Sequence, residues 1–237
     1  MTHVTAVLER DDELRPISVD RQVVAAAEAL AHLLGVDTLR LRVPPGPSSD
    51  RAGAVLKALT DEDVAGSAMS ARGPEPLCWD MITQIPTPVV IVPRNSKRMM
   101  RGISRVLLPM DGTQATAAGV ADLAQRALDA GAAVVGVHVF DTGTVPAFWD
   151  QAAHSHKEWT REFLRRNLPD AVELDLRSGR PTEEVLAEAE QDGVDLVVIG
   201  WGQDLTVGRA ATVRHALTHG RVPVVLVRTG DEDLSQR

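Results

Sequence analysis

Few side chains in this sequence have the types and spacing that catalysis or metal binding requires. His138 lies inside an apolar run with no identifiable Ser, Cys or Asp partner, which favours a packed core residue over a general base. His154 and His156 offer two metal ligands, but no second ligand cluster is present, which favours a solvated helix start. No nucleophile–base set follows from spacing, so these residues do not predict an enzyme.

One carboxylate stands out by its position. Asp111 and Gly112 directly follow the apolar run RVLLPM (105–110) and precede a helical pattern. Aspartate is favoured at the N-cap of a helix in any such strand-to-helix turn. The turn itself therefore predicts an N-capping role for Asp111.

The composition is that of a globular protein that does not bind nucleic acid. The chain has 237 residues, a net charge of −8 and 44% hydrophobic residues. Binding to phosphate backbones needs a basic surface, which this charge does not provide. No apolar run reaches the roughly 18–20 residues of a membrane-spanning helix, and the acidic start does not resemble a secretory signal. A single cysteine, Cys78, excludes an internal disulfide. We expect a cytoplasmic protein without a membrane partner.

The second half alternates short apolar runs with helical patterns. Buried strands are predicted at 105–110, 133–140, 195–200 and 223–227, and a half-exposed edge strand at 172–179, where aliphatic and charged residues alternate. The intervening segments predict helices. The order βαβαβαβαβ predicts a doubly wound, mostly parallel α/β sheet.

The first half repeats this pattern with pieces missing. The segment TPVVIVPR (87–94) matches VPVVLVRT (222–229), 135 residues later, whereas the first strands of the two halves lie only about 100 apart. The first unit is therefore shorter by about one βα unit. The sequence predicts a shortened domain at 1–95, a linker at 96–103, a second domain at 104–230 and a polar tail at 231–237.

The last strand of each unit predicts how the units meet. PVVIV (88–92) and PVVLV (223–227) are apolar, and an exposed apolar edge strand is an aggregation liability. We expect residues 88–92 to pair antiparallel with 223–227, which gives two doubly wound α/β sandwiches in a pseudo-twofold tandem, an internal pseudo-dimer.

Residues 102–229 resemble the universal stress protein family. Four segments carry the resemblance: VLLPMDGTQAT, VVGVHVFD, RSGRPTEEVLAEAEQDGVDLVVIG and ALTHGRVPVVLV. Each is a weak motif alone, but their order and spacing are typical of the family. The first unit resembles the family only through its first helix and TPVVIVP. The resemblance implies the fold shared with adenine nucleotide alpha hydrolases, and dimers that pair through strand five.

The resemblance also implies a nucleotide site in the second domain. Family members that bind ATP hold it at the carboxyl ends of strands one and four. Pro109 would line the adenine pocket, Asp111 would contact the base, the Val139 backbone would lie against it, and Gly200 would lie near the ribose. The N-cap and adenine roles of Asp111 both stay open.

The phosphate loop departs from the family pattern of Gly-x-x-Gly-x9-Gly-Ser/Thr. Gly202 comes one residue early, and the Gly-Ser pair falls on Ala210 and Ala211 in a loop about three residues short. An alanine there can exclude the backbone conformation that glycine permits, and the loss of a serine removes a donor. Gly208 and Thr212 are the residues that could compensate. Trp201 is expected to plug the crevice.

These observations favour a non-enzymatic stress-response or regulatory protein that acts through an unknown protein partner or a homodimer, with no tightly bound cofactor. The alternative is an ATP- or nucleotide-sensing protein that uses the second domain only. An enzyme of the same superfamily is a third interpretation, but residues 111–116 contain neither Ser-Gly-Gly-x-Asp-Ser nor His-x-Gly-His. The first unit has charged residues 9–11 where an adenine would need apolar walls, which predicts no nucleotide there.

Overall fold

The computed structural model describes residues 1–8, 18–43, 48–71, 75–93, 96, 99–141, 158, 162–163, 168–191, 193–206 and 210–230. The elements of the first half are β1 (His3–Val7), α1 (Ser18–Leu34), β2 (Leu39–Arg42), α2 (Ser48–Leu59), β3 (Val64–Ser70), α3 (Glu75–Ile82) and β4 (Val89–Val92). Those of the second half are β5 (Arg105–Met110), α4 (Gln114–Asp129), β6 (Ala133–Asp141), β7 (Glu173–Gly179), α6 (Pro181–Ala189), β8 (Leu196–Trp201), α7 (Ala211–His219) and β9 (Val224–Arg228).

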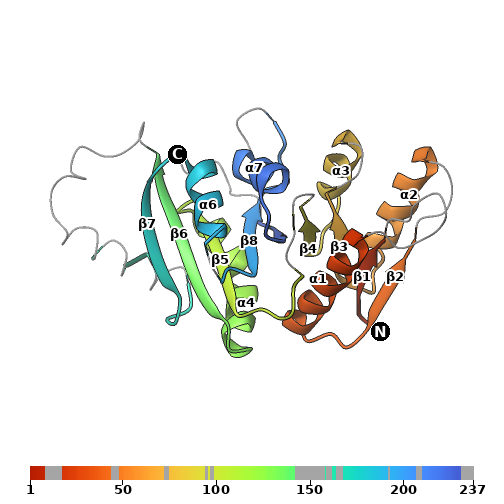
Figure 1. The fold of residues 1–237 in the computed structure, drawn as a ribbon, viewed down its shortest axis with the longest axis horizontal. Helices are drawn as coiled ribbons and strands as arrows, with labels where there is room; N and C mark the ends of the chain where they lie inside the picture. Colours follow the sequence, from red (N-terminus) through yellow and green to blue (C-terminus); the bar gives the residue numbers. More distant parts are fainter. Residues whose placement is uncertain are drawn as a thin grey trace.

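All described strands form one nine-stranded sheet in the order β2-β1-β3-β4-β9-β8-β5-β6-β7. Strands within each half run parallel to one another. The halves join where β4 and β9 pair antiparallel, with Val90 opposite Val225. This is the pairing that the sequence predicts for 88–92 and 223–227. Figure 1 shows the two halves side by side, with β7 and β2 at the far edges.

The two faces of the sheet carry two hydrophobic cores, and each core continues through both halves. The first core packs α1 and α4 against one face. The second packs α2, α3, α6 and α7 against the other. On the first face, the Nη1 atom of Arg126 in α4 donates a hydrogen bond of 3.2 Å to the carbonyl of Leu34 at the end of α1. The halves thus share side-chain packing as well as a strand pair.

Among the described strands, the first half has no counterpart of the outermost strand of the second half. From the junction outward, the second half runs β9-β8-β5-β6-β7 and the first half runs β4-β3-β1-β2. The order matches strand for strand until β7, which has no counterpart beside β2. The shorter repeat distance predicts that one βα unit is missing from the first half, and β2 is an edge strand in the described part of the chain.

Local sequence signals account for most of the elements. Helices α1 and α4 are each followed by a glycine with positive φ, Gly35 at 66° and Gly131 at 83°, a conformation that ends helices readily because glycine has no Cβ. Strand β7 is half-buried, as the alternation of aliphatic and charged residues predicts. Strand β3 is more regular than its small residues suggest, because six of its seven residues are buried between β1 and β4. The sheet is α/β and mostly parallel, as predicted.

No helix in the described ranges is both long and apolar enough to cross a membrane.

Candidate functional site

The candidate site lies where β5 and β8 separate at their carboxyl ends. The β5–β8 ladder pairs Val106 with Leu196 and Leu107 with Val197, and no later pair is formed. On its other side β5 stays paired with β6 as far as Met110. Pro109 is buried in this segment and has no N–H to donate to a ladder. The two strands therefore diverge beyond Leu107, at the topological switch point where open α/β sheets bind ligands.

Asp111 follows β5 at this point, and both of its carboxylate oxygens accept hydrogen bonds. Oδ1 accepts from the backbone N–H of Thr113 at 2.9 Å and from its hydroxyl at 2.8 Å. Oδ2 accepts from the Thr116 hydroxyl at 2.9 Å. The N-cap of α4 is Thr113, whose hydroxyl accepts from the Thr116 N–H. The N-cap role predicted for Asp111 is therefore wrong: Asp111 closes the turn that positions the capping threonine.

Gly200 lies across the crevice from Asp111 and is covered by two threonines. A Cβ placed on Gly200 would lie 3.0 Å from the Cγ2 of Thr229 and 3.3 Å from the Cγ2 of Thr116. Thr229 is 7% exposed, and its N–H donates to the Trp201 carbonyl. Thr116 thus bridges the floor of the crevice, with its methyl on Gly200 and its hydroxyl on Asp111. A side chain at Gly200 would therefore have no room beside these threonines.

The loop after β8 contacts the first half of the chain. The Nε2 atom of Gln203 donates to the carbonyl of Ile85 at 2.7 Å, beyond the end of α3. Gln203 has a φ of 55°, which is unusual for a residue other than glycine. Gly202 faces open space. The segment corresponding to the family's phosphate loop is therefore tied to α3, which the sequence analysis did not anticipate.

The end of this loop keeps a backbone conformation typical of glycine. Ala210, the residue before α7, has φ 51° and ψ 24°, in the left-handed region. The expectation that an alanine would exclude such a conformation is wrong. Ala211 and Thr212 begin α7, where the first N–H groups have no partner within the helix. Gly208 lies outside the described residues.

Trp201 does not lie over Gly200. Adjacent residues of a strand point to opposite faces, and Trp201 is buried in the second core, whereas Gly200 faces the threonines that pack near α4. The expectation that it plugs the crevice stays a prediction. On the same face, the guanidinium of Arg214 in α7 lies 5.2 Å from the ring centre of Trp79 in α3. This cation–π contact adds to the contact between the halves.

The remaining predicted residues lie near the crevice. Val139 is one residue beyond His138, which pairs with Met110 at the end of β5, so its backbone lies beside the Asp111 turn. His138 is half-buried: its Nδ1 lies 2.8 Å from the Met110 carbonyl, and its ring packs edge-on against Phe140. This arrangement fits the packing role predicted for His138.

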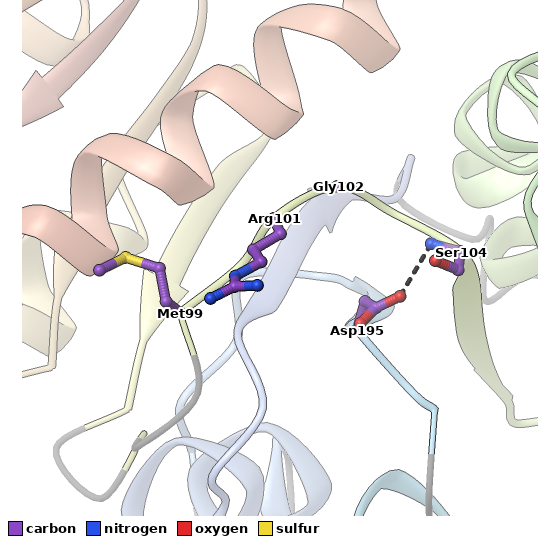
Figure 2. A pocket seen from close by; sticks show the side chains of 5 residues that line it. All are labelled: Met99, Arg101, Gly102, Ser104 and Asp195. Carbon is purple, nitrogen blue, oxygen red and sulfur yellow. Dashed lines mark hydrogen bonds between the residues drawn. The ribbon is translucent and has the colours of Figure 1, made fainter.

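A cavity of about 480 Å³ lies at the opposite edge of the sheet (Figure 2). It is lined by Met99, Arg101, Gly102, Ser104 and Asp195, at the amino ends of β5 and β8. The Oδ2 atom of Asp195 accepts the Ser104 N–H at 2.8 Å and the Arg105 N–H at 3.3 Å. The carboxylate thus fixes the entry of the linker into β5. Figure 2 shows the hydrogen bond between Ser104 and Asp195.

Within the described ranges, no three His, Cys, Asp or Glu side chains gather as metal ligands. His154 and His156 lie outside those ranges.

The structure therefore brings Pro109, Asp111, Val139 and Gly200 to one sheet edge, and adds residues that the sequence analysis missed. Thr113 could have been found, because Asp-x-Thr before a helix is typical of a capped turn. No local sequence pattern predicts a role for Thr116, Thr229 or Gln203, because their contacts depend on the tertiary fold.

Comparison with known proteins identifies the family. The universal stress protein family matches residues 102–228. No curated protein sequence matches. Similar structures include protein PA1789 of Pseudomonas aeruginosa PAO1, described as functionally unknown (TM-score 0.65, 15% identity, 96% of this chain and 92% of that chain). A putative universal stress protein of P. aeruginosa UCBPP-PA14 has a TM-score of 0.59, 16% identity and coverage of 96% and 93%.

A universal stress protein of Archaeoglobus fulgidus DSM 4304 has a TM-score of 0.57, 18% identity and coverage of 96% and 88%. At these identities the structures establish the shared fold over nearly the whole chain. The sequence match covers more than half of the chain, including every strand of the second half. This chain is a member of the universal stress protein family.

Proposed function

We propose that this protein is a non-enzymatic regulatory member of its family, which acts through a protein partner and does not bind ATP tightly. The proposal rests on the protein contacts that Asp111 and Gly200 make in the β5–β8 crevice. Both oxygens of Asp111 are engaged by threonines, and Gly200 is covered by Thr116 and Thr229. A nucleotide at this edge would have to displace these contacts.

The loop after β8 supports the same proposal. Gln203 holds this loop on the Ile85 carbonyl, so moving the loop toward a phosphate would break a hydrogen bond to a buried residue. Leaving a buried acceptor unpaired costs about 1–3 kcal/mol. Ala211 has no hydroxyl to offer in return. The energetic balance favours the loop in its role as a contact between the halves.

We further propose that the first half is a shortened unit of the same type, and that the chain is a tandem pair. Supporting this are the matching strand order outward from the β4–β9 junction and the antiparallel pairing of TPVVIVP with VPVVLV. The shortened unit would have a structural role, since its contacts with Gln203 and Arg214 hold the loop and α7 of the second half.

The alternative is a nucleotide sensor that uses the second half only. The observation in its favour is the left-handed Ala210 directly before α7. Ala210 keeps a backbone conformation that a glycine at this place in the loop would permit, and the first N–H groups of α7 and the helix dipole favour an anion. Binding would then require the loop to leave Ile85.

The two proposals are separated by nucleotide content and affinity. Purified protein would be heated to release small molecules, which chromatography would identify, and ATP would be titrated by calorimetry. We expect an empty protein and no binding below millimolar ATP. A matched pair of variants, Asp111→Ala at the crevice and Asp129→Ala at the far end of α4, tests the site. Micromolar ATP binding that only Asp111→Ala weakens would establish the sensor instead.

A separate experiment tests whether the protein binds a partner. Native mass spectrometry of the protein isolated from unstressed and stressed cells of its source should reveal a complex of fixed stoichiometry with another polypeptide. Recovery of the free chain alone in both states would contradict this proposal. Hydrolysis of ATP by the purified protein, lost in Asp111→Ala, would contradict the non-enzymatic assignment.

A further inference from the structure

The two outer strands of the sheet have complementary sequences. Strand β2 reads Leu-Arg-Leu-Arg and is followed by Val43, while β7 begins Glu-Leu-Asp-Leu after Val172. Each of these strands is paired on one side only among the described strands. An edge strand presents a row of backbone N–H and C=O groups that another strand can pair with. The arginines of β2 and the carboxylates of Glu173 and Asp175 in β7 therefore lie on strands at opposite ends of the sheet, as Figure 1 shows for β2 and β7.

The aliphatic side chains of β2 and β7 lie on the same face of the sheet. Leu39 of β2 and Leu174 of β7 both pack against the first core, so the aliphatic side chains of both strands point to the same face of the sheet. The charged side chains consequently point to the opposite face. Leu41 is 54% exposed and Val43 36% exposed, two of the few large hydrophobic residues that the described surface leaves open.

The direction of the strands fixes how two copies can meet. Strands of the first half run antiparallel to those of the second half, because the halves join through the antiparallel β4–β9 pair. A second copy placed beside the first in the same orientation brings its β7 against β2, antiparallel and with the first-core faces aligned. In this antiparallel pair, aliphatic residues of one strand lie opposite aliphatic residues of the other, and charged residues lie opposite charged residues. Leu39 faces Leu176, Arg40 faces Asp175, Leu41 faces Leu174, Arg42 faces Glu173 and Val43 faces Val172.

We propose that β2 is a docking edge for β7 of a second copy of this chain, in the register that places Arg42 opposite Glu173. Directly opposed side chains in an antiparallel pair have Cβ atoms about 4.5–5.5 Å apart, close enough for every aliphatic and ionic pair of this register to form. The contact is heterologous, since two different edges meet, so it extends head to tail and does not close as a dimer.

Charge favours this contact over the pairing of β2 with itself. Pairing β7 with β7 about its central residue, Leu176, opposes Asp175 to Arg177 and leaves Glu173 opposite Gly179, without a charged partner. Pairing β2 with β2 of another copy about Leu41 places Arg40 against Arg42. Directly opposed like charges destabilise a strand pair. The mixed pairing places Arg40, Arg42, Glu173 and Asp175 each opposite a residue of opposite charge, and it uses the edge that is open beside β2 among the described strands.

Charge reversal on the full chain tests the proposal. Arg42→Glu and Glu173→Arg each place like charges opposite one another, and we expect each to weaken self-association about tenfold. The two changes combined in one chain restore an opposite pair and should restore association. An equimolar mixture of the two single variants should also associate, because each supplies the edge that the other needs. Arg21→Glu, at an exposed position on α1, is the matched control and should leave association unchanged.

Sedimentation velocity from micromolar to near-millimolar protein measures the effect, and circular dichroism verifies that each variant is folded. We expect the average mass of the natural sequence to rise with concentration without a plateau. A natural chain that stays monomeric throughout, or a closed dimer that neither reversal affects, overturns the proposal. So does association that only one of the two reversals weakens, since this would assign the contact to a symmetric edge, or a double variant that stays as weak as the single ones.

Discussion

Ala210 provides a sharp test of the backbone conformation before α7. An L-residue other than glycine in the left-handed region is destabilised, because its Cβ approaches the following carbonyl oxygen. Ala210 has φ 51° and ψ 24°. Its substitution by glycine removes the strain, and alanine at a positive-φ site is typically less stable than glycine by about 1 kcal/mol after chain entropy is counted. The loss of the half-buried methyl group reduces this gain by about 0.4 kcal/mol, half the value for a buried CH₂. We expect Ala210→Gly to stabilise the fold by about 0.5 kcal/mol.

The matched control is Ala118→Gly, at an exposed position inside α4. There the alanine has helical geometry, and glycine should destabilise the protein by about 1 kcal/mol. The same chemical change is therefore expected to have opposite signs at two sites, with a difference of about 1.5 kcal/mol between the variants. Urea denaturation followed by circular dichroism measures both free energies of unfolding, and equal m-values would confirm that the transitions are comparable.

The outcome that refutes the reasoning is a loss of stability in Ala210→Gly as large as in Ala118→Gly. Ala210 would then have an ordinary backbone conformation, and the left-handed start of α7 would no longer support a nucleotide-sensing alternative. In thermal unfolding the 1.5 kcal/mol difference corresponds to roughly 3–6 °C for a chain of this size.

Three further predictions concern the loop, the edge of the sheet and the junction. The double variant Ala210→Gly/Ala211→Ser should not acquire micromolar ATP affinity in calorimetry, because Thr116 and Thr229 still cover Gly200; tight binding would show that the loop residues alone are limiting. Arg177→Met should cost about 2–4 kcal/mol in urea denaturation, since Glu188, whose side chain is 4% exposed, loses its ion-pair partner. The hydrogen bond to Asp175 raises the pKa of Arg177, which keeps this partner charged. Arg180→Met removes an exposed ion pair with Glu183 and should lower the free energy of unfolding by less than about 0.5 kcal/mol. Equal losses in the two variants would contradict the argument that burial makes the Arg177 pair more important. A fragment of residues 1–93 should aggregate on gel filtration because β4 loses β9, and a monomer with a cooperative melt would disprove this dependence.

The order of elements could be predicted from the sequence because it depends on local patterns. The apolar runs 105–110 and 133–140 are strands at the predicted places. The repeated PVV segments predict the β4–β9 pair, since an apolar edge needs a partner. These inferences use periodicity, turn residues and repetition, which are all visible in a single chain.

The candidate site could be predicted only in outline. The resemblance placed Asp111 and Gly200 at one sheet edge, but which groups fill the space between them depends on residues far apart in sequence. Thr229 reaches Gly200 from the end of β9, and Gln203 reaches Ile85 across 118 residues. Trp201 packs in the second core, and the face of a strand residue is set by the core that packs on it. Side-chain contacts of this kind follow from packing and not from local sequence.

The β4–β9 junction has a consequence for the synthesis of the chain. Strand β4 is complete long before β9, its partner, because Val89 and Val224 are about 135 residues apart and β9 is the last described strand. At a translation rate of about 5–20 residues per second, the apolar edge of β4 stays unpaired for roughly 7–27 s. Until β9 emerges, neither hydrophobic core can close across the sheet. The nascent first half is thus the stage at which this protein is most exposed to chaperones and to aggregation with neighbouring nascent chains.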